Sequence, residues 1–594
     1  RELGDGISLQ FDAKAIVPEE DYEFRLELLK EDLGGVRVGY REYRKYFNDT
    51  GGFFQSFSIP VFELDRDMHL DIGSVFIEAT INKPNWPELL FGYEHKFKDG
   101  EKSLLEWGSA TEGGVTRKIF PAVKDVDEEV DIFKAQVKHS VGPIEIGDQF
   151  RYEDYSTETR RVEGERDLDA GSSKSVTASE DHDYEAFFNT LQLGGHVKDK
   201  VYLSMGYLLN RMDGATQFTM NTVPFDSPFD KNWFTDSVDI DHDSHVLSLN
   251  MMFGPFADLT LYSGLQVETV ETDGDTDAVL AERNFSNVAV APEADIITRQ
   301  DEDGFEESIG VRYTGIAHTT LYAEGKWTQQ RIDLSERELE DNVLSFERFT
   351  DTDEDGERYT VGVNTSPISK TTFTARYRRS YKKNDYDHRI DTEPGYSAFI
   401  TKQRFAKDEI TTKVSVRFNS KVQGTLKYQF VAMDIDTSSD TSPPSTVLSG
   451  NYDANIYSTS LTFTPLDRLY VTGLFSYRDA RTSAFANSVP SILTYEDDAY
   501  TLIGTAGYTI SADTSIRTEY VYTLSDNFED NSTQGLPLGT DSNRHRLLIA
   551  FSHRITEAME MELRYGYYKY DEDNNGGVDD YEGHLGGISW VFNF

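Results

Sequence analysis

Asp571, Asp573, Asn575, Gly576 and Glu582 match one ligand-binding pattern in full. The pattern is D-x-[DN]-x-[DN]-G-x₅-E, which is typical of a calcium-binding loop. Oxygen ligands at alternate positions can surround one Ca²⁺, and the glycine permits the sharp turn between them. The same residues can also form an acidic hairpin loop, because strands rather than helices are expected on both sides. Asp571, Asp573, Asn575 and Glu582 are therefore candidate calcium ligands, and calcium at acidic loops is the candidate cofactor.

A second candidate site is a set of basic residues at alternate positions of predicted strands. One interpretation is a positive stripe that contacts an anionic solute or an acidic partner. The other is pairing with carboxylates on the same face, such as Glu268, Glu519 and Glu562. Both interpretations stay open at this point. The residues are Arg376, Arg378, Lys382, Lys413, Arg417, Lys427, Arg517 and Arg564.

The other residue types that carry chemistry do not assemble into a catalytic pattern. The twelve histidines are scattered without the spacing of metal ligands. There is no Ser-His-Asp motif, no phosphate-binding loop and no dinucleotide fingerprint. The chain has no cysteine, which excludes disulfides, thiolate metal sites and covalently attached c-type haem. We therefore predict a protein that is not an enzyme and that holds no covalently bound cofactor.

The last strand points to a membrane barrel. Ile588, Trp590, Phe592 and Phe594 alternate with Ser589, Val591 and Asn593 up to the final residue. A barrel needs such a strand, because the last strand must pair with the first to leave no open edge in lipid. A terminal strand that ends in Phe also resembles the signal that outer-membrane proteins present to the barrel assembly machinery. Trp590, Phe592 and Phe594 are the candidate assembly signal.

Composition supports this interpretation. The 594 residues include 37 Phe and 33 Tyr, although only 38% are hydrophobic. No apolar run approaches the ~20 residues of a membrane-spanning helix. Lys plus Arg number 58 and Asp plus Glu 105, so the net charge of −47 argues against nucleic-acid binding. Acidic runs such as Asp351-Thr352-Asp353-Glu354-Asp355 are interpreted as solvated loops.

One unit recurs along most of the chain: a strand, a tight turn, a second strand and a longer polar loop. Turns are expected at Gly142-Pro143, Gly254-Pro255, Asn419-Ser420 and 465–467. In 257–270 the alternation separates Leu259, Leu261, Leu265 and Val267 from Thr260, Tyr262, Gln266 and Glu268. Period two over nine or more residues is the signature of a barrel strand, with lipid on one side and a wet lumen on the other.

We therefore predict a single domain over 1–594: an all-β, transmembrane, antiparallel up-and-down barrel. It has about 26 strands, within roughly 22 to 28, with short periplasmic turns and long acidic extracellular loops. The strands expected before residue 128 include 52–62, 87–98 and 101–108. The long loops 213–243 and 271–304 are candidates for folding into or over the lumen. Removal of a signal peptide would explain the first residue, Arg1, and so would trimming.

With these features assembled, the chain resembles the MtrB/PioB family, the large outer-membrane barrels of porin–cytochrome electron conduits. The resemblance lies in size, strand number, acidic outer loops and segments such as Gly92-Tyr93-Glu94 followed by Asp99-Gly100. It implies a barrel without haem that sheathes a periplasmic multihaem cytochrome. Members of the family can carry an N-terminal C-x-x-C, which this chain lacks, so the identity of the partner stays open.

Two functions follow from the sequence. The first is a scaffold or sheath in the outer membrane for a periplasmic multihaem electron-transfer partner or another plug protein. An unplugged barrel of this width would leak, because barrels of 16–18 strands already enclose an aqueous channel. The second is a porin for small solutes or ions that constricts its own lumen. Phe218, Phe225, Phe229, Trp233 and Phe234 favour the second, since they give one expected loop much apolar surface.

Overall fold

The computed structural model describes the chain except for a set of short segments. These are residues 1–5, 17–19, 48–65, 113–114, 168–171, 227–229, 284–287, 393–399, 440–445, 487–488, 491–493, 530–538, 575–579 and 594. Every regular element in the described part is a β-strand. No helix there is long and apolar enough to cross a membrane.

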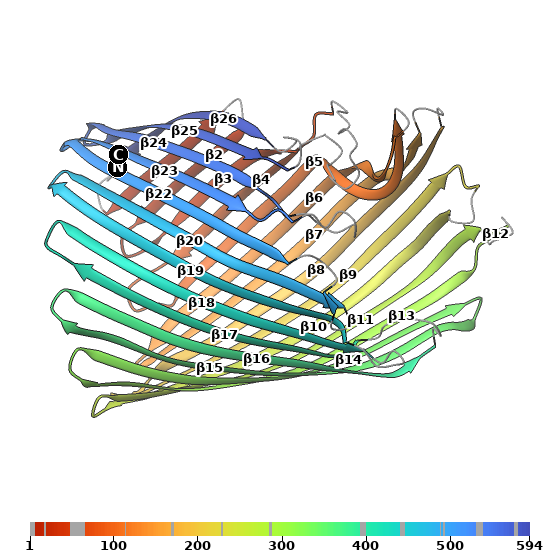
Figure 1. Cartoon of the computed structure of the whole chain (residues 1–594), viewed down its shortest axis with the longest axis horizontal. Helices are drawn as coiled ribbons and strands as arrows, with labels where there is room; N and C mark the ends of the chain where they lie inside the picture. The colour runs from red at the N-terminus through yellow and green to blue at the C-terminus, as the bar shows by residue number, and fades with distance from the viewer. Residues whose placement is uncertain are drawn as a thin grey trace.

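The strands follow one another along the wall of a single barrel (Figure 1). They are β1 (Ile7–Ile16), β2 (Asp21–Lys30), β3 (Gly34–Tyr46), β4 (His69–Ile81), β5 (Glu88–Glu112), β6 (Val115–Val141), β7 (Ile144–Asp167), β8 (Ser172–Lys198), β9 (Val201–Val223), β10 (Lys231–Phe256), β11 (Leu259–Arg283), β12 (Ala289–Val290), β13 (Glu293–Ile316), β14 (Thr319–Glu340), β15 (Val343–Ile368), β16 (Thr371–Asp391), β17 (Ile400–Arg417), β18 (Val422–Ser439), β19 (Thr446–Leu466), β20 (Leu469–Ala486), β21 (Val489–Pro490), β22 (Tyr495–Ser511), β23 (Thr514–Asp526), β24 (Ser542–Thr556), β25 (Met559–Glu572) and β26 (Tyr581–Asn593).

The predicted antiparallel closed barrel is confirmed. Each long strand pairs with the next one along the chain, and β1 pairs with β26 to close the ring. Of the 26 strands in the described residues, β12 and β21 have two residues each, so 24 strands form the ring. The expected strands 87–98 and 101–108 are one strand, β5, because Gly100 adopts a φ of 130° and continues the ladder instead of turning. The expected strand 52–62 lies outside the described residues.

The connections differ between the two ends of the barrel. On the side where both termini lie, which we call the turn side, connections span two to six residues (Figure 1). They include the predicted turns at Gly142-Pro143 and Asn419-Ser420, while Gly254-Pro255 lies just before the turn at residues 257–258. On the far side, connections span up to 22 residues. In the part of the chain that the structure describes, the buried hydrophobic cluster consists of Val431, Ala454 and Ala480, and Tyr452 packs against it.

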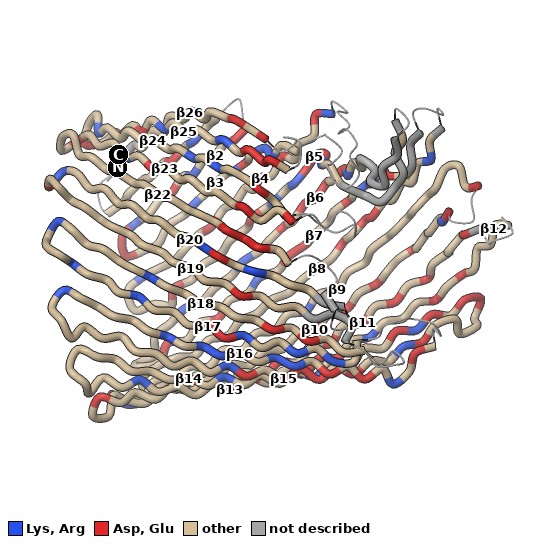
Figure 2. Tube along the Cα trace, in the orientation of Figure 1, with Lys and Arg blue, Asp and Glu red and all other residues tan. Residues whose placement is uncertain are grey.

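An apolar band surrounds the barrel next to the turn side. Leu261 and Val267 on β11 and Ile588 and Trp590 on β26 point outward and are 39–56% exposed. Large hydrophobic side chains exposed at alternate positions of neighbouring strands form the lipid-facing surface of a membrane barrel. Charged residues are sparse in this part of the wall and gather farther from the turns (Figure 2).

Outward-facing tyrosines mark the far edge of the band, and we call them the tyrosine girdle. Each hydroxyl bonds to a polar side chain on the next strand, as in Tyr93 to Asp131 at 2.7 Å and Tyr477 to Asp498 at 2.8 Å. A phenol suits this position, since its ring contacts lipid and its hydroxyl meets water. The girdle consists of Tyr93, Tyr207, Tyr377, Tyr428, Tyr477, Tyr520 and Tyr565.

The strands of the middle of the chain continue far beyond the girdle. β6 and β8 have 27 residues each, although about 9–11 residues cross an apolar band. The prediction of long loops at 213–243 and 271–304 is therefore wrong for most of both segments. β9 continues to Val223, β10 begins at Lys231, β11 continues to Arg283 and β13 begins at Glu293. The acidic run 351–355 likewise lies within β15, with Asp351, Asp353 and Asp355 on one face and Thr352 and Glu354 on the other.

Candidate functional site

The lumen face at the height of the apolar band is polar and carries charges of both signs. Neighbouring strands hold these charges in pairs: Lys134 with Glu94 at 2.7 Å, Lys326 with Glu306 at 2.6 Å, and Arg546 with Glu519 at 2.6 Å. Paired charges at the wall of a wide lumen are expected where water fills it or where a polar surface contacts it. Pairing therefore accounts for much of the charge on this face.

The eight predicted basic residues do not behave as one group. Arg376, Arg378 and Lys382 lie on β16, Lys413 on β17 and Lys427 on β18, all at lumen-facing positions of adjacent strands. Arg517 and Arg564 lie on β23 and β25 and line a different cavity, described below. Arg417 is the last residue of β17, next to a tight turn.

Within the group on β16–β18, only part of the charge is neutralised. Arg376 pairs with Glu409 at 2.7 Å, and Lys382 pairs with Glu354 at 2.6 Å. Lys413 lies directly opposite Lys427, whose ammonium donates to the Gln429 side chain at 3.1 Å. The Nε of Arg378 is buried without a hydrogen-bond partner. Like charges opposite one another on neighbouring strands are destabilising, so this basic stripe has capacity to hold negative charge.

Beyond the girdle the outward face becomes acidic. Asp241 lies between Asp213 and Asp273 on adjacent strands, and the hydrogen bond to Asp213 raises the pKa of its carboxyl. Arg211 beside Asp243 lowers the pKa of that neighbouring carboxyl, with 2.7 Å between the charged atoms. We call this surface the outer acidic belt: Asp213, Asp239, Asp241, Asp243, Glu271, Asp273, Asp275, Asp277, Asp295, Asp301 and Asp303.

The inward face of the same segments of β9, β10, β11 and β13 is largely uncharged, with Glu302 as an exception near its lower edge, while the neighbouring β14 brings Glu336 and Glu338 opposite Thr298 and Ile296. Ala278 and Ala294 are 2–4% exposed, and Phe218 packs edge-on against Trp233 with ring centroids 6.4 Å apart. The order of polarity in the membrane, apolar outside and charged inside, is thus reversed here. We call this surface the upper inner wall: Thr216, Phe218, Val238, Ile240, Thr272, Thr276, Ala278, Ile296, Thr298, Ile332 and Leu334.

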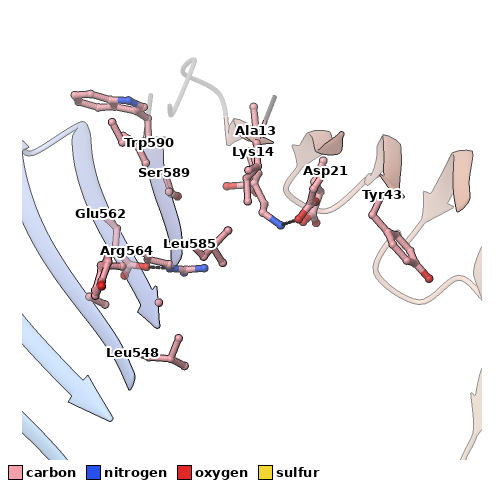
Figure 3. Close-up of a pocket in the computed structure, with 18 of the residues that line it drawn as sticks. Ala13, Lys14, Asp21, Tyr43, Leu548, Glu562, Arg564, Leu585, Ser589 and Trp590 are labelled. Carbon is pink, nitrogen blue, oxygen red and sulfur yellow. Dashed lines mark hydrogen bonds and ion pairs between the residues drawn. The ribbon is translucent and has the colours of Figure 1, made fainter. Parts of the chain in front are cut away.

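The seam between β1 and β26 is the least extensively paired junction of the ring. Among the described residues, four pairs join these strands, from Gln10 with Asn593 to Ala13 with Trp590, whereas β25 and β26 share twelve. A cavity of about 1080 Å³ lies along the seam. Figure 3 shows Lys14 reaching Asp21 on one side and Arg564 reaching Glu562 on the other, with the gap between them.

The candidate calcium ligands are only partly within the described chain, since Asn575 lies outside it. The Asp571 carboxylate forms an ion pair with Lys569, with 2.7 Å between Oδ2 and Nζ. This pairing raises the pKa of the lysine. Glu582 lies opposite the same lysine and accepts a hydrogen bond from Tyr567 at 3.3 Å. Among the described residues, no group of three or more His, Cys, Asp or Glu side chains could hold a metal ion. A calcium site here stays a prediction.

The candidate assembly signal lies at the seam. Trp590 faces outward opposite Ala13, and the backbone of Phe592 pairs with Phe11 and Met559. Phe594 lies outside the described residues. Closure of the ring through the last strand agrees with the sequence analysis, while the assembly role itself stays a prediction.

The Phe and Tyr content of the sequence fits an aromatic girdle, but sequence reasoning did not identify the tyrosines that form it and missed the reversal of polarity above it. A regular signal for the girdle exists in the chain. Tyr207, Tyr377, Tyr520 and Tyr565 each lie seven positions after the last residue of a tight turn, at 200, 370, 513 and 558. Such spacing places each ring at the same height above the turn side.

Comparison with known proteins gives the fold. No family model and no curated protein sequence matches the chain. Solved structures do match, including the ferric yersiniabactin uptake receptor FyuA from Yersinia pestis, with a TM-score of 0.51 at 9% identity over 95% of this chain and 85% of that one. The ferric-catecholate import receptor Fiu from E. coli K12 gives 0.52 at 11% identity over 99% and 82%. The ferric citrate transporter FecA gives 0.52 at 9% identity over 95% and 79%.

The chain has the fold of an outer-membrane β-barrel. At these identities the similarity concerns fold alone. The matched proteins are described as receptors and transporters.

Proposed function

We propose that this chain is a non-enzymatic barrel of the bacterial outer membrane that sheathes a partner protein in its lumen. The turn side faces the periplasm and the tall strands project outward. The partner enters from the periplasm, and a multihaem electron carrier is the candidate that the family resemblance favours. The barrel would then insulate an electron path across the membrane without binding haem itself.

The observation that carries the proposal is the upper inner wall. Strand segments that stand in water on both sides would gain by placing polar residues on both faces. Here the outer face has the acidic belt, and the inner face has side chains such as Ile240, Ile296 and Leu334. A concave surface with so many apolar side chains is expected where another body covers it. The width of a 24-strand ring supports the same view, because 22-stranded transporters already need a plug.

The basic stripe on β16–β18 adds a condition on the partner. A partner surface that is acidic at membrane height would neutralise Lys413 and Lys427, which lie opposite one another. Pairing across a partly desolvated interface improves specificity and the rate of association.

A self-constricted porin for small solutes or ions is the second candidate. The basic stripe favours it, since an anionic solute could also neutralise these residues. Descriptions of the similar structures as uptake receptors and transporters favour solute passage as well. The expected constricting loops at 213–243 and 271–304 no longer support it, because these segments are largely wall.

Purification from the native outer membrane tests the proposal. We expect a second protein, and haem absorbance if the partner is a cytochrome, in the same chromatographic peak as the barrel. The barrel alone in a planar bilayer should conduct heavily. A small and stable conductance from the partner-free barrel, with no partner in the native preparation, would contradict the sheath and leave the porin.

A further inference from the structure

The seam between β1 and β26 opens within the apolar band. Its ladder stops at Ala13 and Trp590, so the next pair in register, Lys14 and Ser589, is not made. Residues 581–589 of β26 pair with β25, and in the described part of the chain they have no strand partner on the other side. The outward side chains beside this edge include Ile588, which is 56% exposed at the level of lipid.

The cavity along the seam passes between the two faces of the wall. Outward-facing Trp590 lines it together with lumen-facing Lys14, Arg564 and Leu585 (Figure 3). Ile549 and Ile588, which also face outward, belong to the same lining. The charges at its inner end are satisfied on their own sides, Lys14 by Asp21 and Arg564 by Glu562. The gap is therefore apolar where it meets lipid and charged where it meets the lumen.

An open strand edge in lipid is costly, because each unpaired backbone group costs several kcal/mol in the hydrocarbon region. A purely apolar molecule in the gap would leave these groups unpaired. Water alone would leave Ile588 and its apolar neighbours without a lipid contact. An amphipathic molecule meets both demands, with a polar head at the backbone edge and a chain that extends into the bilayer.

We propose that the seam is a lateral portal occupied by a membrane phospholipid, with its head group on the lumen side and an acyl chain between β26 and β1. Six cationic and five acidic side chains line the cavity, so a zwitterionic head group suits it better than a strongly anionic one. The portal joins the lumen to the outer part of the bilayer. It is independent of the sheath function, since it concerns the wall and not the contents of the barrel.

Two cysteine pairs test whether the seam is open. Lys14→Cys with Ser589→Cys would join the first unmade pair, and Asp12→Cys with Val591→Cys is the matched control at a lumen-facing pair that is made. Opposite residues of an antiparallel ladder lie within disulfide reach, about 4.5–5.5 Å between Cα atoms. The native chain has no cysteine to interfere. We expect the control pair to oxidise fully in phospholipid nanodiscs and the test pair to stay reduced. Full oxidation of the test pair would overturn the portal.

A fluorescence experiment tests the occupant. A bimane label on Leu585→Cys reports on the cavity, and the same label on Ser308→Cys reports on the lumen face of β13. In nanodiscs that contain phosphatidylethanolamine with brominated chains, we expect quenching several-fold stronger at 585 than at 308. Equal and weak quenching at both positions would overturn the proposal, because the gap would then hold something other than lipid. Resistance of the unheated barrel to SDS, shown by a mobility shift on heating, establishes that each variant is folded.

Discussion

The wall below the tyrosine girdle and the wall above it are built from the same strands with opposite polarity. Along β11, Leu261 and Val267 face outward below the girdle, and Asp273 and Asp275 face outward above it. The inward face changes in the other direction, from Gln266 and Glu268 to residues such as Thr272, Thr276 and Ala278. The alternation along β11 continues unbroken from one region to the other, so the medium on each side of the wall, and not the secondary structure, determines which residue types occur.

The largest effect is expected for a charge on the lipid face. Leu261→Arg should destabilise the barrel by roughly 2–4 kcal/mol if the position is near the midplane, because lipid cannot solvate a guanidinium. Gln266→Arg, on the lumen face of the same strand, should cost little. Reversible unfolding in urea from lipid vesicles measures both. Equal costs would mean that the assignment of faces on β11 is wrong.

The adjacent residues Ile296 and Ile297 test the comparison above the girdle. Ile296→Asp places a carboxylate on the upper inner wall, and burial of an unpaired polar group there costs about 1–3 kcal/mol. We expect about a tenfold loss of partner retention on a column that captures the barrel. Ile297→Asp, on the outer face where the side chain is 49% exposed, should leave retention unchanged. Equal retention in the two variants would remove the support that the upper inner wall gives to the sheath.

The basic stripe allows a smaller test on the lumen face below the girdle. Lys427→Glu should stabilise the partner-free barrel by about 0.2–1 kcal/mol, because it turns a like-charge pair with Lys413 into an attractive one. Lys427→Gln should give part of this increase in stability, because it removes the repulsion without adding an attraction. Destabilisation by both changes would show that the two lysines do not repel each other in the empty barrel.

The smallest effect concerns pH and the outer acidic belt. Since Asp213 raises the pKa of Asp241, the folded barrel binds this proton more tightly than the unfolded chain does. The resulting stability is present at low pH and is lost as the pH rises through the folded-state pKa. Asp241→Asn should flatten this decline in thermal melts recorded as the pH rises from about 4, the ordinary pKa of an aspartate. The contribution of Asp243 to stability has the opposite pH dependence, because Arg211 lowers the pKa of this carboxyl. It is present at neutral pH and is lost as the pH falls through the folded-state pKa.

The sequence predicted the barrel because the evidence for it is local. Alternation in 257–270 and the turn residues at Gly142-Pro143 suffice to identify strands and tight turns, and neither depends on distant contacts. The height of the wall was missed because acidic runs such as 351–355 were interpreted as solvated loops. In a strand whose outer face meets water, acids at every second position are as stable as they are in a loop.

The sites were harder to predict because they depend on which strands become neighbours. Five of the eight basic residues come together since β16, β17 and β18 are adjacent, whereas Arg517 and Arg564 lie at the seam. The shortness of the seam follows from the register of the whole ring, which no single segment determines. The reversal of polarity could have been recognised only after the girdle fixed the edge of the membrane.

The unequal strand lengths give the outer mouth a slope. β1 and β2 have ten residues each and β26 has 13, while β6 and β8 have 27. Among the described strands, the wall is therefore lowest at the seam and tallest at β6 and β8. A second protein that docked at this mouth would contact more of the wall on the side of β6 and β8 than at the seam.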